Sequence, residues 1–389
     1  MNYELSADQA AVKELFEGFC NNEIAPHAHD LDNAHAGATA KRLLENCAAA
    51  AASGYHAMFF DEEFGGTCRD LIAQAVAGEA LAKACPSTYL SLQASVEKFG
   101  GTLSAFGTPS QKKAYLPDLV KGRIIGTAAA YESETGSDIL SMQATAVLRD
   151  DVWILNGNKS FVVNASIADV FLVYAATAPP SGDGPSVTCF IVNKGAPGME
   201  IGAEYETMGF RGVPICDVVF KDCEVTGDMV LGDRNAGGEI FRQAAEAGKT
   251  GAAVCSLGIA AACLEEASGH SKRRRSFGRL INRYQEVAFK LSDMVIMTDL
   301  SRLLIYKALR ARETGDPEAD VLASCAKVFA AESATRAADY AMQIFGGHGY
   351  LKGGPVERLY RNAKLGELID GTSEIHRVFI AGRLVERFG

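Results

Sequence analysis

An aspartate near the end of the chain has the surroundings of a catalytic base. Asp370 follows two apolar residues and precedes a Gly-Thr-Ser segment that could begin a helix over residues 375–384. Thr372 or Ser373 can cap that helix, which leaves the Asp370 side chain free to point elsewhere. An apolar setting would raise the pKa of such a carboxyl group and make it a better proton acceptor. An ordinary aspartate in a first helical turn is the alternative.

Two glycine-containing segments could lie against a ligand. The first, Tyr131–Asp138, places Gly136 beside a hydroxyl and a carboxylate, and glycine lets backbone N–H groups approach a bound molecule closely. The second, Gln343–Tyr350, has three glycines in four residues. A polar turn and a loop ending a helix are the alternatives. His348 in the second segment has no carboxylate or thiol nearby in the sequence, which favours a structural role.

The densest positive charge is the run Lys272–Arg275, followed by Ser-Phe-Gly. Guanidinium groups bind phosphate oxygens in pairs, so the run could hold a phosphate. A solvated face and a nucleic-acid patch remain alternatives for an isolated run of this kind.

The pattern of apolar residues predicts three regions that must position these segments. Apolar residues recur every three or four positions from Leu5 to about residue 121, where Ser6 and Gln9 resemble a capping box. Short β-branched and aromatic segments follow, separated by turn residues that include Asn156-Gly157. The helical period returns near Gly237, with breaks at 315–317 and 346–354. We therefore expect an α+β protein with an N-terminal helical domain (1–122), a middle antiparallel β domain (123–236) and a C-terminal helical bundle (237–389).

Composition limits the function. The chain has 389 residues, enough for two or three packed units, and 38 basic against 48 acidic residues give a net charge of −10. This charge disfavours nucleic acid and anionic membranes as partners. Ten cysteines without a CxxC pair or zinc spacing predict no metal and a reducing cytoplasm. The sequence contains no run of ~18 apolar residues, so we expect no membrane span. The sequence lacks both a GxxxxGK[ST] loop and a strand followed by GxGxxG, so it has no anchor for a P-loop NTPase or a nicotinamide Rossmann enzyme.

These motifs occur in an order that resembles the acyl-CoA dehydrogenase family of flavoproteins over nearly the whole chain. Further matching pieces are Glu62–Gly66, Phe106–Lys112, Tyr115–Pro117, Met208–Gly212 and Arg361–Lys364. The resemblance implies the family fold, in which a helical domain, a β domain and a helical bundle follow one another. It also implies FAD in the cleft between the β domain and the bundle, with residues 128–137 and 161–163 along the isoalloxazine.

Site residues follow from this resemblance by position. The expected FAD contacts are Ala130, Tyr131, Gly136, Ser137, Phe161, Val163, Arg274, Phe277, Gln285, Gln343, Gly346, Gly347, Thr372 and Glu374. Of these, Arg274, Phe277, Gln285 and the stretch 343–347 match residues that reach the FAD of a neighbouring subunit, which implies a homo-oligomer, usually a tetramer. The expected contacts to the CoA substrate are Ser137, Glu246, Lys249 and Gly371. The family usually has arginine at the position of Lys249, so a two-pronged contact becomes a point charge here.

The resemblance also implies the reaction. Asp370 occupies the position of the base that removes the α-proton of an acyl-CoA thioester, while flavin N5 accepts the β-hydride on the opposite face. Backbone N–H at the base and a flavin ribityl hydroxyl stabilise the negative charge on the thioester oxygen. Electrons normally pass to electron-transferring flavoprotein.

Two departures from the family pattern stand out, of which the first shapes the expected substrate and the second concerns the flavin. Most relatives have glutamate in place of Asp370, commonly preceded by tyrosine where this chain has Ile369. Aspartate reaches about 1.3 to 1.5 Å less far. We therefore expect an α-branched or alicyclic acyl group that lies closer to the base, as in cyclohexanecarboxyl-CoA dehydrogenases, with room from Ile369 and Gly366. Tyr131 and Val163 replace threonines that usually contact the flavin. The alternative base position near Gly248 has no carboxylate.

Other functions stay open at this point. A nitroalkane-oxidase-like flavin oxidase also uses an aspartate base, and oxygen consumption would identify it. A non-catalytic CoA-thioester binding protein is favoured by the two lost threonines. A nucleic-acid-binding protein is suggested only by the arginine run.

Overall fold

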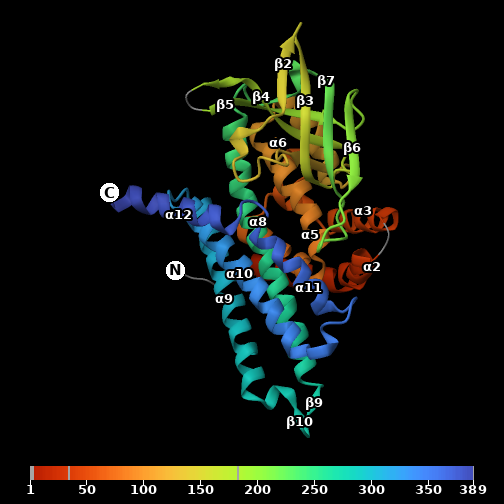
Figure 1. Cartoon of the computed structure of the whole chain (residues 1–389), viewed down its shortest axis with the longest axis vertical. Helices are drawn as coiled ribbons and strands as arrows, with labels where there is room; N and C mark the ends of the chain where they lie inside the picture. The colour runs from red at the N-terminus through yellow and green to blue at the C-terminus, as the bar shows by residue number, and fades with distance from the viewer. Residues whose placement is uncertain (1–3, 34–35, 182–183, 389) are drawn as a thin grey trace.

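The structure, a computed structural model, describes residues 4–33, 36–181 and 184–388. A sheet lies at one end, and helices from both halves of the chain pack together beneath it (Figure 1). The N-terminal helices are α1 (Ala7–Phe19), α2 (Ala28–Asn33), α3 (Ala36–Ala52), α4 (Leu71–Ala84), α5 (Pro86–Leu92), α6 (Gly101–Phe106) and α7 (Pro109–Val120). Ser6 and Gln9 form the expected capping box at the start of α1.

Of the N-terminal segments that depart from α-helical geometry, one lies beside Asp370. Between α5 and α6 the chain forms η5, a π-helix over Gln93–Gly100. A π-helix turns more slowly than an α-helix, so side chains along it point in directions that the 3.6-residue period does not give. Two charged residues, Glu97 and Lys98, lie in this segment.

The middle of the chain forms an eight-stranded sheet. Its strands are β1 (Gly126–Ala129), β2 (Thr145–Arg149), β3 (Val152–Val163), β4 (Val170–Ser181), β5 (Gly184–Asn193), β6 (Met199–Glu204), β7 (Ile215–Thr226) and β8 (Val230–Leu231). The order is β6-β7-β3-β2-β4-β5-β8, with β1 beside β4. Most pairs are antiparallel as expected, but β1 and β2 each run parallel to β4, so the sheet is mixed.

The prediction of a turn at Asn156-Gly157 is wrong. β3 continues through both residues, and its pairing with β7 shifts there between Leu155 and Gly157, as in a β-bulge. Gly157 has φ of 140°, and a Cβ on it would lie 2.6 Å from the Cα of Ala144. The glycine is therefore needed for a bulge and a close backbone approach, not for a hairpin.

The C-terminal part is a bundle of long helices. It comprises α8 (Gly237–Ser271), the short strands β9 (Arg275–Ser276) and β10 (Arg279–Leu280), α9 (Gln285–Glu313), α10 (Ala319–Phe345), α11 (Pro355–Ala363) and α12 (Ser373–Phe388). The helices break where the Gly-Asp-Pro and glycine-dense runs predict. Within the described ranges only α8 is long and apolar enough to cross a membrane, and 78% of its most apolar window is buried inside the protein, which is typical of a core helix.

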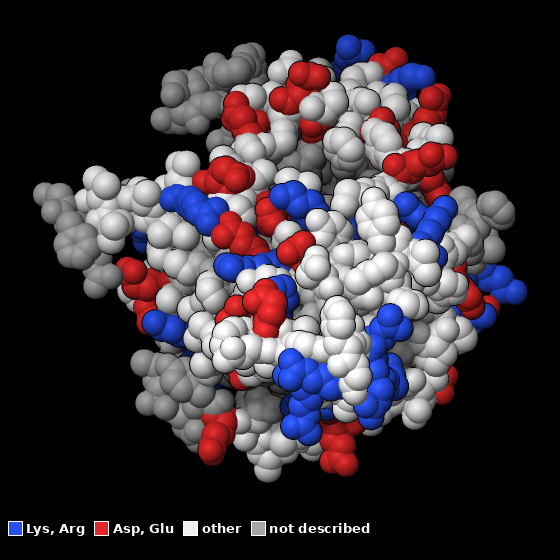
Figure 2. Space-filling view, turned by 60° about the horizontal axis from the view of Figure 1, so that its bottom comes forward, with Lys and Arg blue, Asp and Glu red and all other residues white. Residues whose placement is uncertain are grey.

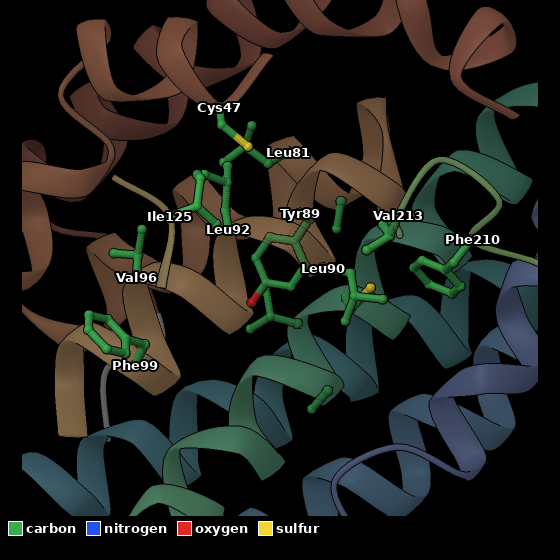
Figure 3. Packing of buried hydrophobic residues seen from close by; sticks show 14 of the residues in the cluster. Cys47, Leu81, Tyr89, Leu90, Leu92, Val96, Phe99, Ile125, Phe210 and Val213 are labelled. Carbon is green, nitrogen blue, oxygen red and sulfur yellow. The ribbon is translucent and has the colours of Figure 1, made fainter. Parts of the chain in front are cut away.

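The core joins the two helical parts. Side chains of α5 and η5, including Leu92, Val96 and Phe99, are buried in the layer between the N-terminal helices and α8 (Figure 3). Tyr89 reaches furthest, and its O–H donates to the carbonyl oxygen of Gly251 in α8 at 3.2 Å. This packing fixes the π-helix against α8, which matters because both elements contact Asp370.

Candidate active site

Asp370 lies in a turn between a short 3₁₀ segment, Lys364–Glu367, and α12. Its φ is 55° and that of Gly371 is 90°, so two consecutive residues are left-handed. Aspartate and asparagine adopt this region more readily than longer side chains because their short polar groups bond locally. The hydroxyl of Thr372 accepts from the N–H of Ile375 at 3.3 Å, which confirms the predicted cap.

Two buried side chains hold the carbonyl groups of this turn. His376 Nε2 donates to the carbonyl oxygen of Asp370 at 2.9 Å, since a carbonyl can only accept, and Nδ1 faces Ser324 Oγ at 3.3 Å. Burial lowers the pKa of His376 to about 4, so its ring is neutral at pH 7. Lys327 Nζ donates to the carbonyl oxygen of Gly371 at 2.5 Å. These two hydrogen bonds therefore hold the turn through its carbonyl groups, and the Asp370 side chain points away from them.

The Asp370 carboxylate is 4% exposed and enclosed by η5 and α8. Lys98 Nζ forms an ion pair with its Oδ1. Gln93 Nε2 lies 3.4 Å from Oδ2 and also donates to the carbonyl oxygen of Gly248 at 3.3 Å. A Cβ on Gly248 would lie 2.9 Å from Asp370 Cγ, so the missing side chain is what lets the carboxylate pack against α8. Asp370 is thus a buried carboxylate that forms an ion pair with Lys98.

A second carboxyl group lies close to the first. Glu97 accepts from the O–H of Tyr55 at 3.1 Å. Burial raises the pKa of Glu97 to about 7, the nearby negative charge of Asp370 adds to this rise, and Lys98 and the tyrosine hydroxyls oppose it. Glu97 also lines a cavity of about 230 Å³ between α4, α6, α8 and α9, together with Tyr89 and Arg312.

The segments expected along a flavin are joined by a buried ion pair. Lys159 Nζ lies 2.7 Å from Glu132 Oε1 and donates to the carbonyl oxygen of Ala130 at 3.1 Å. Burial opposes ionisation of Glu132, but hydrogen bonds from Lys159 and from the N–H groups of Gln143 and Ala144 outweigh it and lower the pKa of Glu132. Tyr131 lies on the same segment, where burial and the charge of Asp370 raise its pKa. The structure thus brings Tyr131 and Asp370 to one place.

The residues present here fit a large polar cofactor. Thr135 Oγ1 and Ser373 Oγ are buried hydroxyls without a hydrogen-bond partner in the described part of the chain, and buried polar atoms normally have one. Thr135 lies in the 128–137 segment, and Ser373 lies between Thr372 and Glu374, which are two of the expected FAD contacts. Phe161 has φ of 56°, is 60% exposed and stacks on Tyr205 with ring centroids 5.1 Å apart. Val163 is half-buried beside it and accepts from Thr127 Oγ1 at 2.6 Å through its carbonyl oxygen.

Other expected cofactor residues lie at the far end of the molecule from the sheet (Figure 1). The β9–β10 tip carries Arg274 and Phe277, whose side chain is 95% exposed, and Gln285 opens α9 beside it. Gln343, Gly346 and Gly347 end α10 at the same place, where the rings of Phe345 and His270 stack 4.1 Å apart. Lys and Arg side chains gather on this end in Figure 2. Within one chain this group does not meet Tyr131.

The residues expected to contact CoA lie on α8, on the Tyr131 segment and in the turn at Asp370. Lys249 Nζ lies 2.6 Å from Glu246 Oε1 and 4.6 Å from the centroid of the Phe379 ring. Ser137 is exposed in the turn of the Tyr131 segment, and Gly371 directly follows Asp370. Glu374 is exposed in the first turn of α12.

Comparison with known proteins identifies the family. The N-terminal, middle and C-terminal domain profiles of acyl-CoA dehydrogenases match residues 6–123, 127–223 and 235–385. The chain belongs to the acyl-CoA dehydrogenase family. A probable acyl-CoA dehydrogenase of Bacillus subtilis, YngJ, is 36% identical over 99% of this chain and 100% of its own. The cyclohex-1-ene-1-carbonyl-CoA dehydrogenase of Syntrophus aciditrophicus is 33% identical over 98% of this chain and 90% of its own. The solved structure of butyryl-CoA dehydrogenase from Megasphaera elsdenii is 31% identical to this chain, with a TM-score of 0.92. The match covers 99% of this chain and 100% of that one.

This membership makes the protein a flavin-dependent oxidoreductase of the acyl-CoA dehydrogenase type, with FAD as its cofactor. The expected fold of helical, β and helical parts is confirmed. Sequence reasoning did not single out Lys98, Glu97, Lys159 or His376 as parts of the site. The visible signal was a charged pair, Glu-Lys, between otherwise apolar or small residues at 91–103, and a lysine inside a strand pattern.

Proposed function

We propose that this enzyme oxidises an acyl-CoA thioester whose α-carbon is branched or part of a ring, with Asp370 as the base. The observation that carries the proposal is the enclosed Asp370 carboxylate, which is 4% exposed and packs against Gly248. Of the two positions from which the family supplies its base, only residue 370 holds a carboxylate in this chain, since Gly248 occupies the other.

The residues of this chain divide the work as follows. FAD, when bound, accepts a hydride from the β-carbon at N5. Asp370 takes the α-proton, and the left-handed turn fixes the direction from which its carboxylate approaches. His376 and Lys327 keep that turn in place by binding the carbonyl oxygens of Asp370 and Gly371. Backbone N–H at the base donates to the thioester oxygen and stabilises the charge that develops there.

The length of the base favours a bulky acyl group. Because aspartate lacks one methylene of glutamate, its carboxylate reaches about 1.3 to 1.5 Å less far. A substituent or ring at the α-carbon moves the reacting atom toward the base. The similarity to the cyclohex-1-ene-1-carbonyl-CoA dehydrogenase of Syntrophus aciditrophicus supports an alicyclic group, whereas the butyryl-CoA dehydrogenase supports a short linear one.

One source of room expected from the sequence is wrong. A Cβ on Gly366 would lie 2.5 Å from Ser256 Oγ and 3.4 Å from Ala331 Cβ. The missing side chain of Gly366 is therefore used for close packing against α8 and α10. Space for a bulky acyl group must come from Ile369 and from the region between η5 and α8.

CoA and a second subunit complete the proposed site. We assign Ser137, Glu246, Lys249 and Gly371 to the CoA part of the substrate, with Lys249 as a point charge for an anionic group. The β9–β10 tip and the end of α10 would reach the FAD of a neighbouring subunit, since they lie far from Tyr131 in their own chain. Exposed apolar side chains on α9 support a homo-oligomer, which we expect to be a tetramer: Phe289, Val295, Ile296, Leu300 and Leu303.

The surroundings of the reaction follow from the family and from the cysteines. We propose electron-transferring flavoprotein as the acceptor that reoxidises the flavin. All ten cysteines are free thiols, which supports a reducing cytoplasm.

A substrate panel tests this function. The holoenzyme, with a dye as electron acceptor, should oxidise cyclohexanecarboxyl-CoA with a higher kcat/KM than butyryl-CoA or octanoyl-CoA, and product mass should fall by two hydrogens. A preference for either linear thioester would contradict the bulky-substrate proposal. Oxygen consumption without dye reduction would instead indicate a flavin oxidase.

A further inference from the structure

The base of this enzyme is paired with a cation. Lys98 comes from the π-helix η5, and its Nζ binds the Asp370 carboxylate while 21% of its side chain stays exposed. Lys98 donates to Oδ1 of the base, so one of the two oxygens that could accept the α-proton is already bonded to a cation. An anionic group on the bound substrate would draw Lys98 toward itself and free this oxygen.

Geometry places Lys98 next to the reacting carbons. A base lies about 3 to 3.5 Å from the atom it deprotonates in a productive complex. With Lys98 Nζ in direct contact with Asp370, the ammonium group lies within roughly 6 Å of the α-carbon under the proposed function. A substituent two bonds from the α-carbon can therefore reach it.

An apolar acyl group, such as cyclohexanecarboxyl, would fit this site less well than one that carries an anion. Its binding would exclude water from the Lys98–Asp370 ion pair without giving Lys98 another partner, and removing an ion pair from water is costly. The cavity beyond Glu97 is also polar in part, since Gln74, Gln243 and Arg312 contribute to its walls. An anionic oxygen on the substrate would instead give Lys98 a partner and release Asp370.

We propose that Lys98 is a specificity-determining residue that binds a carboxylate carried on the acyl group within two bonds of the α-carbon. The substrate would then be the monothioester of an α-branched or alicyclic dicarboxylic acid. This inference rests on the proposed function. The reaction is unchanged: one proton goes to Asp370, one hydride goes to FAD, and the carboxylate keeps its charge.

Glu97 does not oppose this assignment. It is partly protonated at neutral pH, and the Tyr55 hydroxyl already bonds its oxygen. The cation that contacts the base is Lys98, so the charge next to the reacting carbons favours an anionic substituent over an ammonium group.

Two thioesters with the same carbon skeleton test the inference. Methylsuccinyl-CoA, with the methyl group next to the thioester, carries a carboxylate where 2-methylbutyryl-CoA carries a methyl group. The holoenzyme should favour methylsuccinyl-CoA in kcat/KM by about 10- to 100-fold, the range for a hydrogen bond to a charged group. Lys98→Met should abolish this preference, Lys98→Arg should keep it, and Lys83→Met, which removes a surface pair with Glu265, should leave it unchanged.

A binding measurement separates the possible outcomes. Titration with each thioester should perturb the flavin absorbance and so report its binding. Lys98→Met should weaken the binding of methylsuccinyl-CoA by a similar factor. If wild type and Lys98→Met oxidise both thioesters with the same ratio, the inference is wrong and the dehydrogenase function stands. If 2-methylbutyryl-CoA is the better substrate of the wild type, the inference is also wrong, even where Lys98→Met does not fold. If neither thioester binds or reacts but cyclohexanecarboxyl-CoA is oxidised, the inference is wrong and the proposed function stands. If none of the three reacts, the proposed function fails as well.

Discussion

Replacing Glu97 with glutamine should change how stability depends on pH. In the folded protein burial raises the pKa of Glu97 from 4.5 to about 7. Between these two values the folded state holds a proton that the unfolded chain has lost, so stability falls as pH rises from about 4.5 to 7 and is constant above. The full difference corresponds to about 3 kcal/mol per chain. Glu97→Gln removes this loss, because an amide cannot ionise but still accepts from Tyr55.

Thermal unfolding of the holoenzyme gives the measurement. An unfolding entropy of about 2.1 cal/mol/K per residue converts 3 kcal/mol into about 4 °C for a chain of 389 residues. We expect Glu97→Gln to unfold at nearly the wild-type temperature at pH 5 and about 4 °C higher at pH 8. The difference in unfolding temperature between Glu97→Gln and wild type at each pH removes the contribution of other titrating groups. One of these is His376, whose pKa is lowered to about 4 by burial, so that its effect on stability has the opposite dependence on pH.

The control is Glu265→Gln, because the Glu265 side chain is 67% exposed and makes a surface pair with Lys83. Its unfolding temperature should differ from wild type by the same small amount at both pH values. If Glu97→Gln and wild type give parallel curves from pH 5 to 8, Glu97 is ionised in the folded state and the argument from its burial is wrong.

Three further substitutions probe the base and the segment beside it. Asp370→Asn should retain FAD absorbance and lose at least ~10²-fold in kcat, and near-normal turnover would remove Asp370 from its role. Gly248→Ala places a Cβ 2.9 Å from Asp370 Cγ, so kcat should fall about tenfold or more while FAD is retained. An unchanged kcat would show that the Asp370 carboxylate does not pack against Gly248 during the reaction. Lys159→Met leaves the buried Glu132 carboxylate unpaired and should cost about 3–5 kcal/mol in unfolding free energy and weaken FAD binding. Lys221→Met removes a surface pair with Glu200 and should change neither.

Much of the fold could be predicted because local pattern and tertiary structure agree. Helical periodicity, the Ser6 capping box and the Gly-Asp-Pro break all correspond to observed helix starts and ends. The failure at Asn156-Gly157 has a physical cause. Glycine is required both in tight hairpins and where backbones approach closely, and the sequence does not tell which of the two applies.

The site could be predicted only where a residue lies in a recognisable order of motifs. Asp370 was found in this way, but Lys98 and Glu97 were not. Their direction depends on the π-helical turn at Gln93–Gly100, and α-helical periodicity would place them on other faces of the helix. Lys159 was missed because its partner, Glu132, lies 27 residues away and meets it only through the sheet.

A short base, a left-handed turn, a glycine and a lysine form one coupled unit in this enzyme. Aspartate suits the positive φ at residue 370 better than a longer side chain. Its carboxylate then lies close enough to α8 that Gly248 cannot carry a Cβ, and within reach of Lys98 from η5. Restoring glutamate at position 370 would push the carboxylate into α8 or away from Lys98. Asp370→Glu alone should therefore not make linear thioesters the preferred substrates. The double variant that combines Asp370→Glu with Lys98→Met removes both the short reach of the base and the positive charge, which together favour a branched, anionic acyl group.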